Sequence, residues 1–168
     1  KDTATPQVCV DACRARCKAT KKTRCCVVLA ETLERKRRLR RPASKGVSAG
    51  GCHAVNLALR CADNKMIGLA GMALLYPMLD DKTGSTVMPL AHQGQYLWTA
   101  EQNHYGWRTF LGKAPGSDKI PSHHVPARAK TLSGLPPTFI AVGELDLFYA
   151  ENCAFATRLE AAGIAAEL

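Results

Sequence analysis

The apolar residues of this chain fall into three short runs separated by longer mixed segments. The longest run, residues 66–76, is almost uninterrupted, which is typical of a buried strand. A second run, residues 138–142, follows a proline-rich segment, and a third begins at Ile164. The segments between these runs are long enough for helices. The pattern therefore predicts strands that alternate with helices, as in an α/β protein.

Three of the intervening segments are predicted to be helices. Residues 49–63 combine apolar and small side chains, and Thr99 with Gln102 forms a capping box ahead of residues 100–111. Residues 151–162 form the third helix, and a glycine directly follows each of the last two helices, where it favours a stop. The apolar face of the third helix comprises Phe155, Leu159 and Ala162.

Charge is distributed unevenly along the 168 residues. The net charge is +9, but residues 1–45 hold 14 Lys and Arg against 4 Asp and Glu, whereas residues 46–168 hold 9 against 10. A dense basic run at residues 35–41 predicts either a polyanion-binding patch or a solvated tail, and like-charge repulsion favours the tail. No specific nucleic-acid partner is expected, because no nucleic-acid-binding fold signature occurs.

Five of the eight cysteines also lie in the first 45 residues. Cys9, Cys13 and Cys17 would share one helical face, but no Cys-x-x-Cys pair or histidine accompanies them, so no metal site is predicted. The sequence has no apolar run long enough to cross a membrane, and its first ten residues do not resemble a signal peptide. We therefore expect a cytoplasmic protein with reduced thiols, without a transmembrane segment. The sequence does not indicate an oligomeric state.

The segment Gly46-Val47-Ser48-Ala49-Gly50-Gly51 fits the pattern Gly-x-Ser-x-Gly, in which a nucleophilic serine occupies a strained turn between a strand and a helix. The alternative is a glycine-rich turn that the serine merely caps. A nucleophilic serine needs a histidine as base, an acid, and donors for an oxyanion. Ser48 is therefore a candidate nucleophile only if such partners exist.

From about Gly46 to Leu168 the sequence resembles the hormone-sensitive-lipase-like branch of the α/β-hydrolases, which are carboxylesterases and lipases. The resemblance implies a partial α/β-hydrolase fold, whose mostly parallel sheet is flanked by helices and lacks its N-terminal strands. It implies hydrolysis of a small-molecule carboxylic ester through an acyl-enzyme, without a cofactor. The segments that carry the resemblance are Gly46–Gly51, Leu74–Asp81, Trp98–Gly112, Pro126–Ala129, Leu132–Pro137 and Val142–Asp146.

The resemblance also implies roles for particular residues. Ser48 would attack the ester, the backbone N–H of Ala49 would stabilise the oxyanion, and Asp146 would be the acid that orients the base. Glu144 is the alternative carboxylate. Trp98, Tyr105 and Trp107 are candidate substrate-pocket residues, or else they pack a surface helix onto the core.

The family order places the base after the acid, yet no histidine follows Asp146. His53 and His124 do not fit that order. The chain is therefore predicted to be a fragment that ends before its catalytic histidine, inactive as given. A non-catalytic binding protein of the same fold is the alternative, and a basic polyanion-binding protein is the third hypothesis.

The segment ahead of Ser48 departs from the family pattern. No His-Gly-Gly-Gly loop occurs, and Pro42 and Lys45 lie where a buried strand is expected. Proline cannot donate to a central sheet ladder, and a buried lysine would need a partner. We therefore predict that residues 1–45 are a basic, cysteine-rich segment foreign to the family, either read out of frame or disordered, and that residues 46–168 form an incomplete α/β-hydrolase domain.

Overall fold

The structure, a computed structural model, describes residues 41–168. The predicted basic run, the cysteine cluster and the assignment of residues 1–45 as foreign to the family therefore fall almost wholly outside the described residues.

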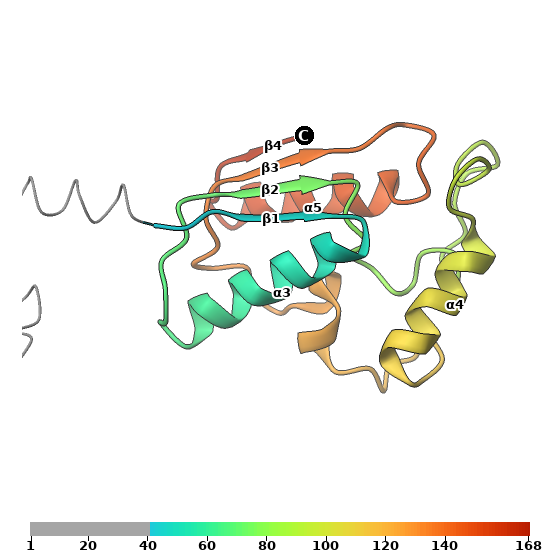
Figure 1. Cartoon of the computed structure of the whole chain (residues 1–168). Helices are drawn as coiled ribbons and strands as arrows, with labels where there is room; N and C mark the ends of the chain where they lie inside the picture. The colour runs from blue at the N-terminus through green and yellow to red at the C-terminus, as the bar shows by residue number, and fades with distance from the viewer. Residues whose placement is uncertain (1–40) are drawn as a thin grey trace, which may run out of the picture. The chain divides into compact units, whose positions relative to one another are not determined.

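A parallel sheet of four strands organises the described part of the chain, in the spatial order β1-β2-β3-β4 (Figure 1). In the register of the first three strands, Gly46 lies beside Leu74, which lies beside Ile140. Because the strands are parallel, their carboxyl ends meet at one edge of the sheet. This arrangement confirms the predicted partial α/β-hydrolase fold. The strands are β1 (Ser44–Val47), β2 (Met72–Leu75), β3 (Thr138–Ala141) and β4 (Ala166–Glu167).

The arguments from Pro42 and Lys45 against a strand directly ahead of Ser48 do not hold, because β1 lies there. Strand β1 begins at Ser44, two residues after Pro42, so the missing proline N–H lies outside the ladder, and the Pro42 carbonyl accepts a hydrogen bond from the Ala70 N–H (3.0 Å). Lys45 is exposed and needs no buried partner. Strand β1 crosses the boundary predicted between residues 45 and 46.

The apolar run 66–76 forms a shorter strand than predicted. Only Met72–Leu75 is strand, whereas Met66 and Ile67 lie in a loop with 67% and 54% of their surface exposed. The reason is the length of the neighbouring strand: β1 offers pairing partners only from Ser44, which lies opposite Met72. Before Met72, the only backbone hydrogen bonds that join this segment to β1 or to the described residues ahead of it are those of Ala70 with Pro42 and of Gly71 with Ser44, so Met66 and Ile67 lie outside the ladder.

The three predicted helices are present, with bounds that differ by two residues at most. The capping box is confirmed, because the Gln102 N–H donates to the Thr99 hydroxyl (3.3 Å) and the Thr99 N–H donates to the Gln102 side chain (3.0 Å). Within residues 41–168, no helix has the length and apolar character needed to cross a membrane. The helices are α3 (Ala49–Asp63), α4 (Ala100–Leu111) and α5 (Tyr149–Ala161), with short 3₁₀ turns η1 (Ser122–His124) and η2 (Pro126–Arg128).

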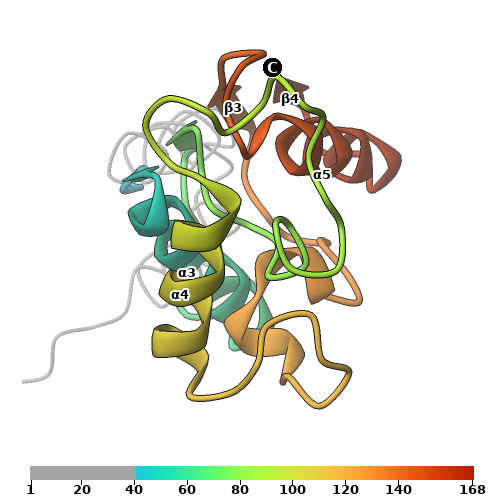
Figure 2. The same ribbon diagram turned by 90° about the vertical axis from the view of Figure 1, so that its right-hand side faces the viewer.

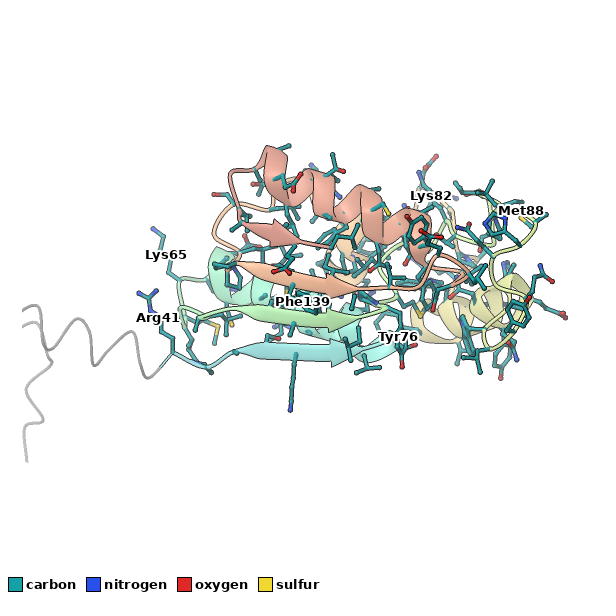
Figure 3. All side chains as sticks on the ribbon, turned by 90° about the horizontal axis from the view of Figure 1, so that it is seen from above. Arg41, Lys65, Tyr76, Lys82, Met88 and Phe139 are labelled. Atoms are coloured by element: carbon teal, nitrogen blue, oxygen red, sulfur yellow. The ribbon has the colours of Figure 1, made fainter. Side chains whose placement is uncertain are left out.

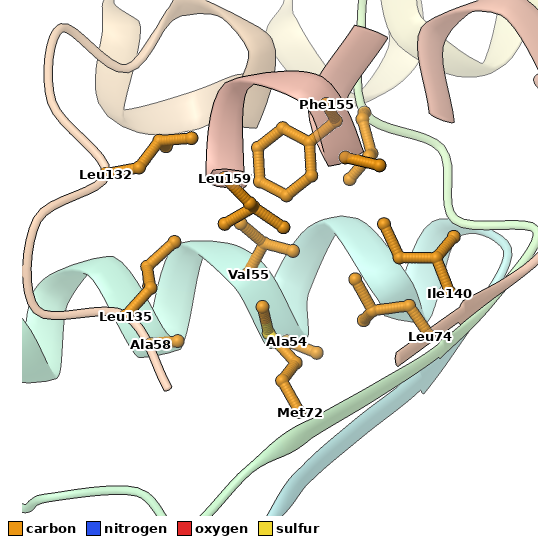
Figure 4. Packing of buried hydrophobic residues seen from close by; sticks show 12 residues of the cluster. Ala54, Val55, Ala58, Met72, Leu74, Leu132, Leu135, Ile140, Phe155 and Leu159 are labelled. Carbon is orange, nitrogen blue, oxygen red and sulfur yellow. The ribbon is translucent and has the colours of Figure 1, made fainter. Parts of the chain in front are cut away.

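Helices α3 and α5 cover one face of the sheet, as Figure 1 shows. Val55 from α3 and Phe155 and Leu159 from α5 meet Leu74 and Ile140 from the strands, and all five are at most 1% exposed (Figure 4). This cluster confirms the predicted apolar face of the last helix at Phe155 and Leu159, although Ala162 is exposed.

Helix α4 lies beside α3 (Figure 2). The two helices contribute Trp107 and Cys52 to a second apolar cluster. The His53 ring of α3 meets the Phe110 ring of α4 edge to face, with centroids 5.4 Å apart. The cluster includes residues of α3, α4 and the segment that precedes α5. The turns at the carboxyl ends of the strands are therefore packed against a shared apolar core. Its buried members are Cys52, Met78, Trp107, Ile120, Val125, Leu147 and Phe148.

The opposite face of the sheet carries no helix among the described residues. Figure 3 looks onto this face and shows Phe139 without a covering element from residues 41–168. Val47, Leu75 and Phe139 are each 41–47% exposed, although parallel sheets are usually covered on both faces. Alternate residues of each strand therefore differ sharply in burial.

This one-sided burial predicts different costs for truncating two adjacent side chains of β3. Replacing Ile140 by Ala should lower the free energy of unfolding by about 2–5 kcal/mol, because it opens a cavity in the core. Replacing Phe139 by Ala should cost about 1 kcal/mol or less, since its ring is partly solvated. Urea denaturation of both variants measures the difference, and equal costs would contradict the packing described here.

Candidate active site

The turn at Ser48, between β1 and α3, has a strained backbone. Its φ is 53° and its ψ is −126°, a conformation that residues other than glycine rarely adopt. Three hydrogen bonds hold the turn: the Ser48 N–H donates to the Leu75 carbonyl (3.0 Å), and the Ser48 carbonyl accepts from the N–H groups of Gly51 (2.8 Å) and Met78 (3.1 Å). The strain is thus maintained by β2 and by the segment that follows it.

The Ser48 hydroxyl does not cap the helix that it precedes. An N-cap serine ordinarily accepts a hydrogen bond from the first helical turn, but the side chain of Ser48 makes no capping bond. The N–H of Ala49, the first residue of α3, donates no hydrogen bond to any described residue. A hydroxyl and a free backbone donor thus lie next to each other at the start of a helix, where the helix dipole favours negative charge.

Two glycines, Gly46 and Gly51, make this turn sterically possible. A Cβ on Gly46 would lie 2.4 Å from the carbonyl oxygen of Gly50, and a Cβ on Gly51 would lie 2.4 Å from the Cβ of Pro77. A Cβ on Gly50, in contrast, would meet no described atom within 4 Å. The close packing between the strand, the helix and residue 77 therefore depends on Gly46 and Gly51.

Asp146 lies in the turn between β3 and α5, at the same sheet edge as Ser48. One oxygen of its carboxylate, Oδ1, accepts a hydrogen bond from the Phe148 N–H (2.8 Å), which fixes the side chain. The other oxygen accepts no hydrogen bond from the described residues. Asp146 is partly buried, whereas the alternative carboxylate, Glu144, is exposed.

A cavity of about 260 Å³ lies beside Asp146, and Trp98 lines it. The loop before α4 is attached to the Asp146 turn, because the Gly94 N–H donates to the Leu145 carbonyl (3.0 Å) and the Gln93 side chain donates to the Glu144 carbonyl (3.2 Å). The lining residues are Gly94, Tyr96, Leu97, Trp98, Gly143, Leu145, Asp146 and Leu147.

The three aromatic candidates occupy different environments. Trp98 is 38% exposed at the cavity, Tyr105 is 72% exposed on α4 and does not line this cavity, and Trp107 is fully buried in the second apolar cluster. The indole N–H of Trp98 donates to the Asn103 side chain (3.1 Å). The structure thus brings only Trp98 of the three beside Asp146.

No histidine hydrogen-bonds to the Ser48 hydroxyl within residues 41–168. His53 and His124 both contact the ring of Phe110, on the α4 side of the molecule. His104 pairs with the Ser85 hydroxyl (3.2 Å). The described residues also contain no group of three potential metal ligands.

The segment after β2 is held by buried charge. Asp81 is fully buried and binds the Arg128 guanidinium through both carboxylate oxygens, at 2.6 and 2.8 Å. The side-chain hydrogen bond to Asp81 raises the pKa of Arg128. A paired buried charge of this kind fixes geometry, and loss of one partner is costly.

Sequence reasoning missed several buried polar residues around the site, most clearly Glu151 and Asn152 on α5, which are 8% and 0% exposed. The signal was available in part: Asn152 precedes Phe155 and Leu159 by three and seven residues, so a polar side chain lies on the apolar face of this helix. Gln93 and Asn103 are also buried, but neither belongs to a pattern that would predict it.

The fold and this site agree with comparisons to known proteins. The sequence profile of the alpha/beta hydrolase fold family matches residues 4–168. The chain belongs to this family. The match therefore includes most of residues 1–45, of which the structure describes only residues 41–45. A comparison with curated proteins finds no significant match.

Solved structures that the chain resembles include esterases and a lipase. The esterase LipW from Mycobacterium marinum is 33% identical (TM-score 0.61), with 75% of this chain and 38% of that chain covered. A bacterial heroin esterase is 32% identical (TM-score 0.69), with coverage of 75% and 40%. A hormone-sensitive lipase from a metagenome library is 25% identical (TM-score 0.65), with coverage of 75% and 42%. The aligned part thus spans about two fifths of each of these relatives.

The glycine contacts predict opposite effects for neighbouring substitutions at the Ser48 turn. Gly46→Ala should destabilise the chain by about 1–3 kcal/mol or more, because its Cβ would collide with helix backbone. Gly50→Ala should be neutral or stabilising by about 0.5 kcal/mol, since it removes a glycine from a helix without a clash. Urea denaturation tests both, and a Gly50→Ala variant as unstable as Gly46→Ala would refute this account.

Proposed function

We propose that this chain is part of a serine carboxylesterase, in which Ser48 is the nucleophile and Asp146 the acid of a catalytic triad. The substrate would be a small carboxylic ester. The observation that carries the proposal is the strained Ser48 turn, whose hydroxyl makes no capping bond and lies next to the free Ala49 N–H. Strain at a single non-glycine residue, held by three backbone hydrogen bonds, is a feature of functional sites.

The environment of Asp146 supports its role as the acid. One carboxylate oxygen is held by the Phe148 N–H, and the other is free to accept a hydrogen bond from the Nδ1–H of an imidazole. Glu144 is more exposed, and no described residue hydrogen-bonds to its carboxylate. Ser48 and Asp146 follow parallel strands, so a histidine at this edge could contact both.

The chemistry follows from these positions. The Ser48 oxygen attacks the ester carbonyl carbon while a histidine takes the hydroxyl proton, and the Ala49 N–H donates to the oxyanion that forms. Collapse of this intermediate expels the alcohol, which takes the proton from the imidazolium, and water then hydrolyses the acyl-enzyme by the same steps. No histidine follows Asp146 among the 168 residues, so the proposal names no residue of this chain as the base.

Trp98 is proposed to contact the substrate, because it lines the cavity beside Asp146. Tyr105 and Trp107 were grouped with it on the sequence. The proposal gives Trp107 a supporting part, since its buried indole belongs to the apolar cluster that also contains Leu147 and Phe148, the two residues after Asp146.

A reconstituted chain tests the proposal. Residues 41–168 are retained, and flanking segments of the family pattern are added, with a His-Gly-Gly-Gly loop ahead of residue 41 and a histidine-containing loop after residue 168. Hydrolysis of a nitrophenyl acetate should then appear. Ser48→Ala should lower kcat by about a millionfold and Asp146→Asn by about ten-thousandfold, as losses in known serine triads suggest.

The matched control is Glu144→Gln, which alters the neighbouring exposed carboxylate and should change kcat by no more than a few fold. The chain of 168 residues alone should not exceed background hydrolysis. Turnover that survives Ser48→Ala, or that depends on Glu144 rather than Asp146, would overturn these assignments.

A further inference from the structure

Residue Glu151 lies on the first turns of α5 and reaches the segment that follows β2. Its Oε1 accepts hydrogen bonds from the N–H groups of Leu79 (2.6 Å) and Asp80 (3.2 Å), and its Oε2 accepts one from the Thr83 hydroxyl. The side chain is 8% exposed. One buried carboxyl group thus satisfies three donors of a single loop.

The same loop is bonded to the Ser48 turn. The Met78 N–H, next to Leu79 in sequence, donates to the Ser48 carbonyl (3.1 Å). Asn152, next to Glu151, donates from its side-chain amide to the Pro77 carbonyl (3.0 Å). Residues 77–80 are therefore bonded to the Ser48 turn on one side and to α5 on the other.

The same N-terminal end of α5 is also bonded to the Asp146 turn. The Phe148 N–H donates to the Asp146 carboxylate, and the Tyr149 N–H donates to the Asp146 carbonyl (3.2 Å). Asn152 donates to the Phe148 carbonyl as well (2.7 Å). A continuous series of hydrogen bonds therefore runs from Asp146 through the start of α5 and residues 77–80 to Ser48.

We propose that Glu151 is a positioning residue that fixes the Ser48 turn relative to the Asp146 turn, acting through the backbone of residues 77–80. That Glu151 serves an active site rests on the function proposed for Ser48 and Asp146. The hydrogen-bonded connection itself is independent of that function. Glu151 would touch neither substrate nor reacting atoms.

Protonation of Glu151 should regulate this connection. The pKa of Glu151 is raised to about 8, chiefly by burial. The hydrogen bonds from Leu79, Thr83 and Asp80 lower the pKa, and the negative charge of Asp80 raises it. From α3, Glu151 faces Cys52, whose thiol has its pKa raised to about 12, chiefly by burial, and stays neutral. Because the folded pKa lies above the unfolded value of about 4.5, the stability that Glu151 contributes is present at low pH and is lost as the pH rises from about 5 to beyond 8.

Hydrogen exchange of the 168-residue chain tests the proposal without requiring catalysis. In Glu151→Ala, the amides of Leu79 and Asp80, and also that of Met78, should exchange about tenfold faster or more, as expected when a buried hydrogen bond is lost. The amide of Ile140 in β3 reports global stability and should change less. Glu151→Gln, which keeps an acceptor and the side-chain shape, should restore slow exchange.

Asn103→Ala is the matched control. Asn103 is also a buried polar residue on a helix, and its side chain donates to the same loop at the Thr83 carbonyl (2.8 Å), but it makes no hydrogen bond to residues 77–80. The Asn103→Ala substitution should leave the exchange rate of the Met78 amide unchanged. Equal acceleration of Met78 and Ile140 in Glu151→Ala, or equal acceleration of Met78 in both variants, would overturn the proposal.

If Glu151→Ala does not fold, hydrogen exchange measured as a function of pH tests the positioning role of Glu151 instead. After correction for the intrinsic base-catalysed rate, the Met78, Leu79 and Asp80 amides of the unchanged chain should lose protection together as the pH rises from about 5 to about 8, and those of Glu151→Gln should not. Parallel behaviour of the two chains would refute the positioning role. An inactive reconstituted enzyme with this exchange pattern intact would instead refute the proposed function alone.

Discussion

The left-handed backbone at Ser48 is the constraint on which the rest of the site depends. It costs free energy, of the order of 1–3 kcal/mol for such a residue, and persists only because its surroundings allow no alternative. Its N–H is bound to the carbonyl of Leu75, its carbonyl is bound to the Met78 N–H, and Gly46 and Gly51 permit the close approach of strand, helix and Pro77. The parallel pairing of β1 with β2 supplies the first of these restraints.

Buried polar groups, together with the second apolar cluster, order the loops at this edge of the sheet. Asp81 with Arg128 and Glu151 with the amides of residues 79 and 80 fix the loop after β2 at two points. Polar groups withdrawn from water must be bonded, and each bond has a preferred geometry, so such groups specify one arrangement where apolar packing would accept several. This explains how segments without regular structure can place Ser48 and Asp146 reproducibly.

The sequence predicted well those features that depend on local patterns. The helix at residues 49–63 matches its predicted bounds, and the capping box at Thr99 is present, because propensity and capping act over a few residues. Strand lengths were predicted less well. The extent of β2 depends on where β1 begins, and this pairing joins residues that are far apart in the sequence. The strand at Ser44 was missed because Pro42 was assumed to lie within the ladder.

The candidate site was predictable only in part for the same reason. The motif around Ser48 and the position of Asp146 after a strand can be read from sequence, and the structure places both at the same sheet edge. Aromatic residues that share one helix cannot be assigned to cavity or core from spacing alone, and the structure separates exposed Tyr105 from buried Trp107. The polar residues on α5 had no assigned role until the loop that they bind was seen.

The central claim is that the strained turn presents the Ser48 hydroxyl as a nucleophile. Its most direct test is to treat the reconstituted enzyme with a nitrophenyl phosphonate, which phosphonylates activated serines, and to locate the added mass by peptide mass spectrometry. The account predicts a single phosphonyl group on Ser48. An active enzyme that is labelled at another residue, or not labelled at all, would contradict it.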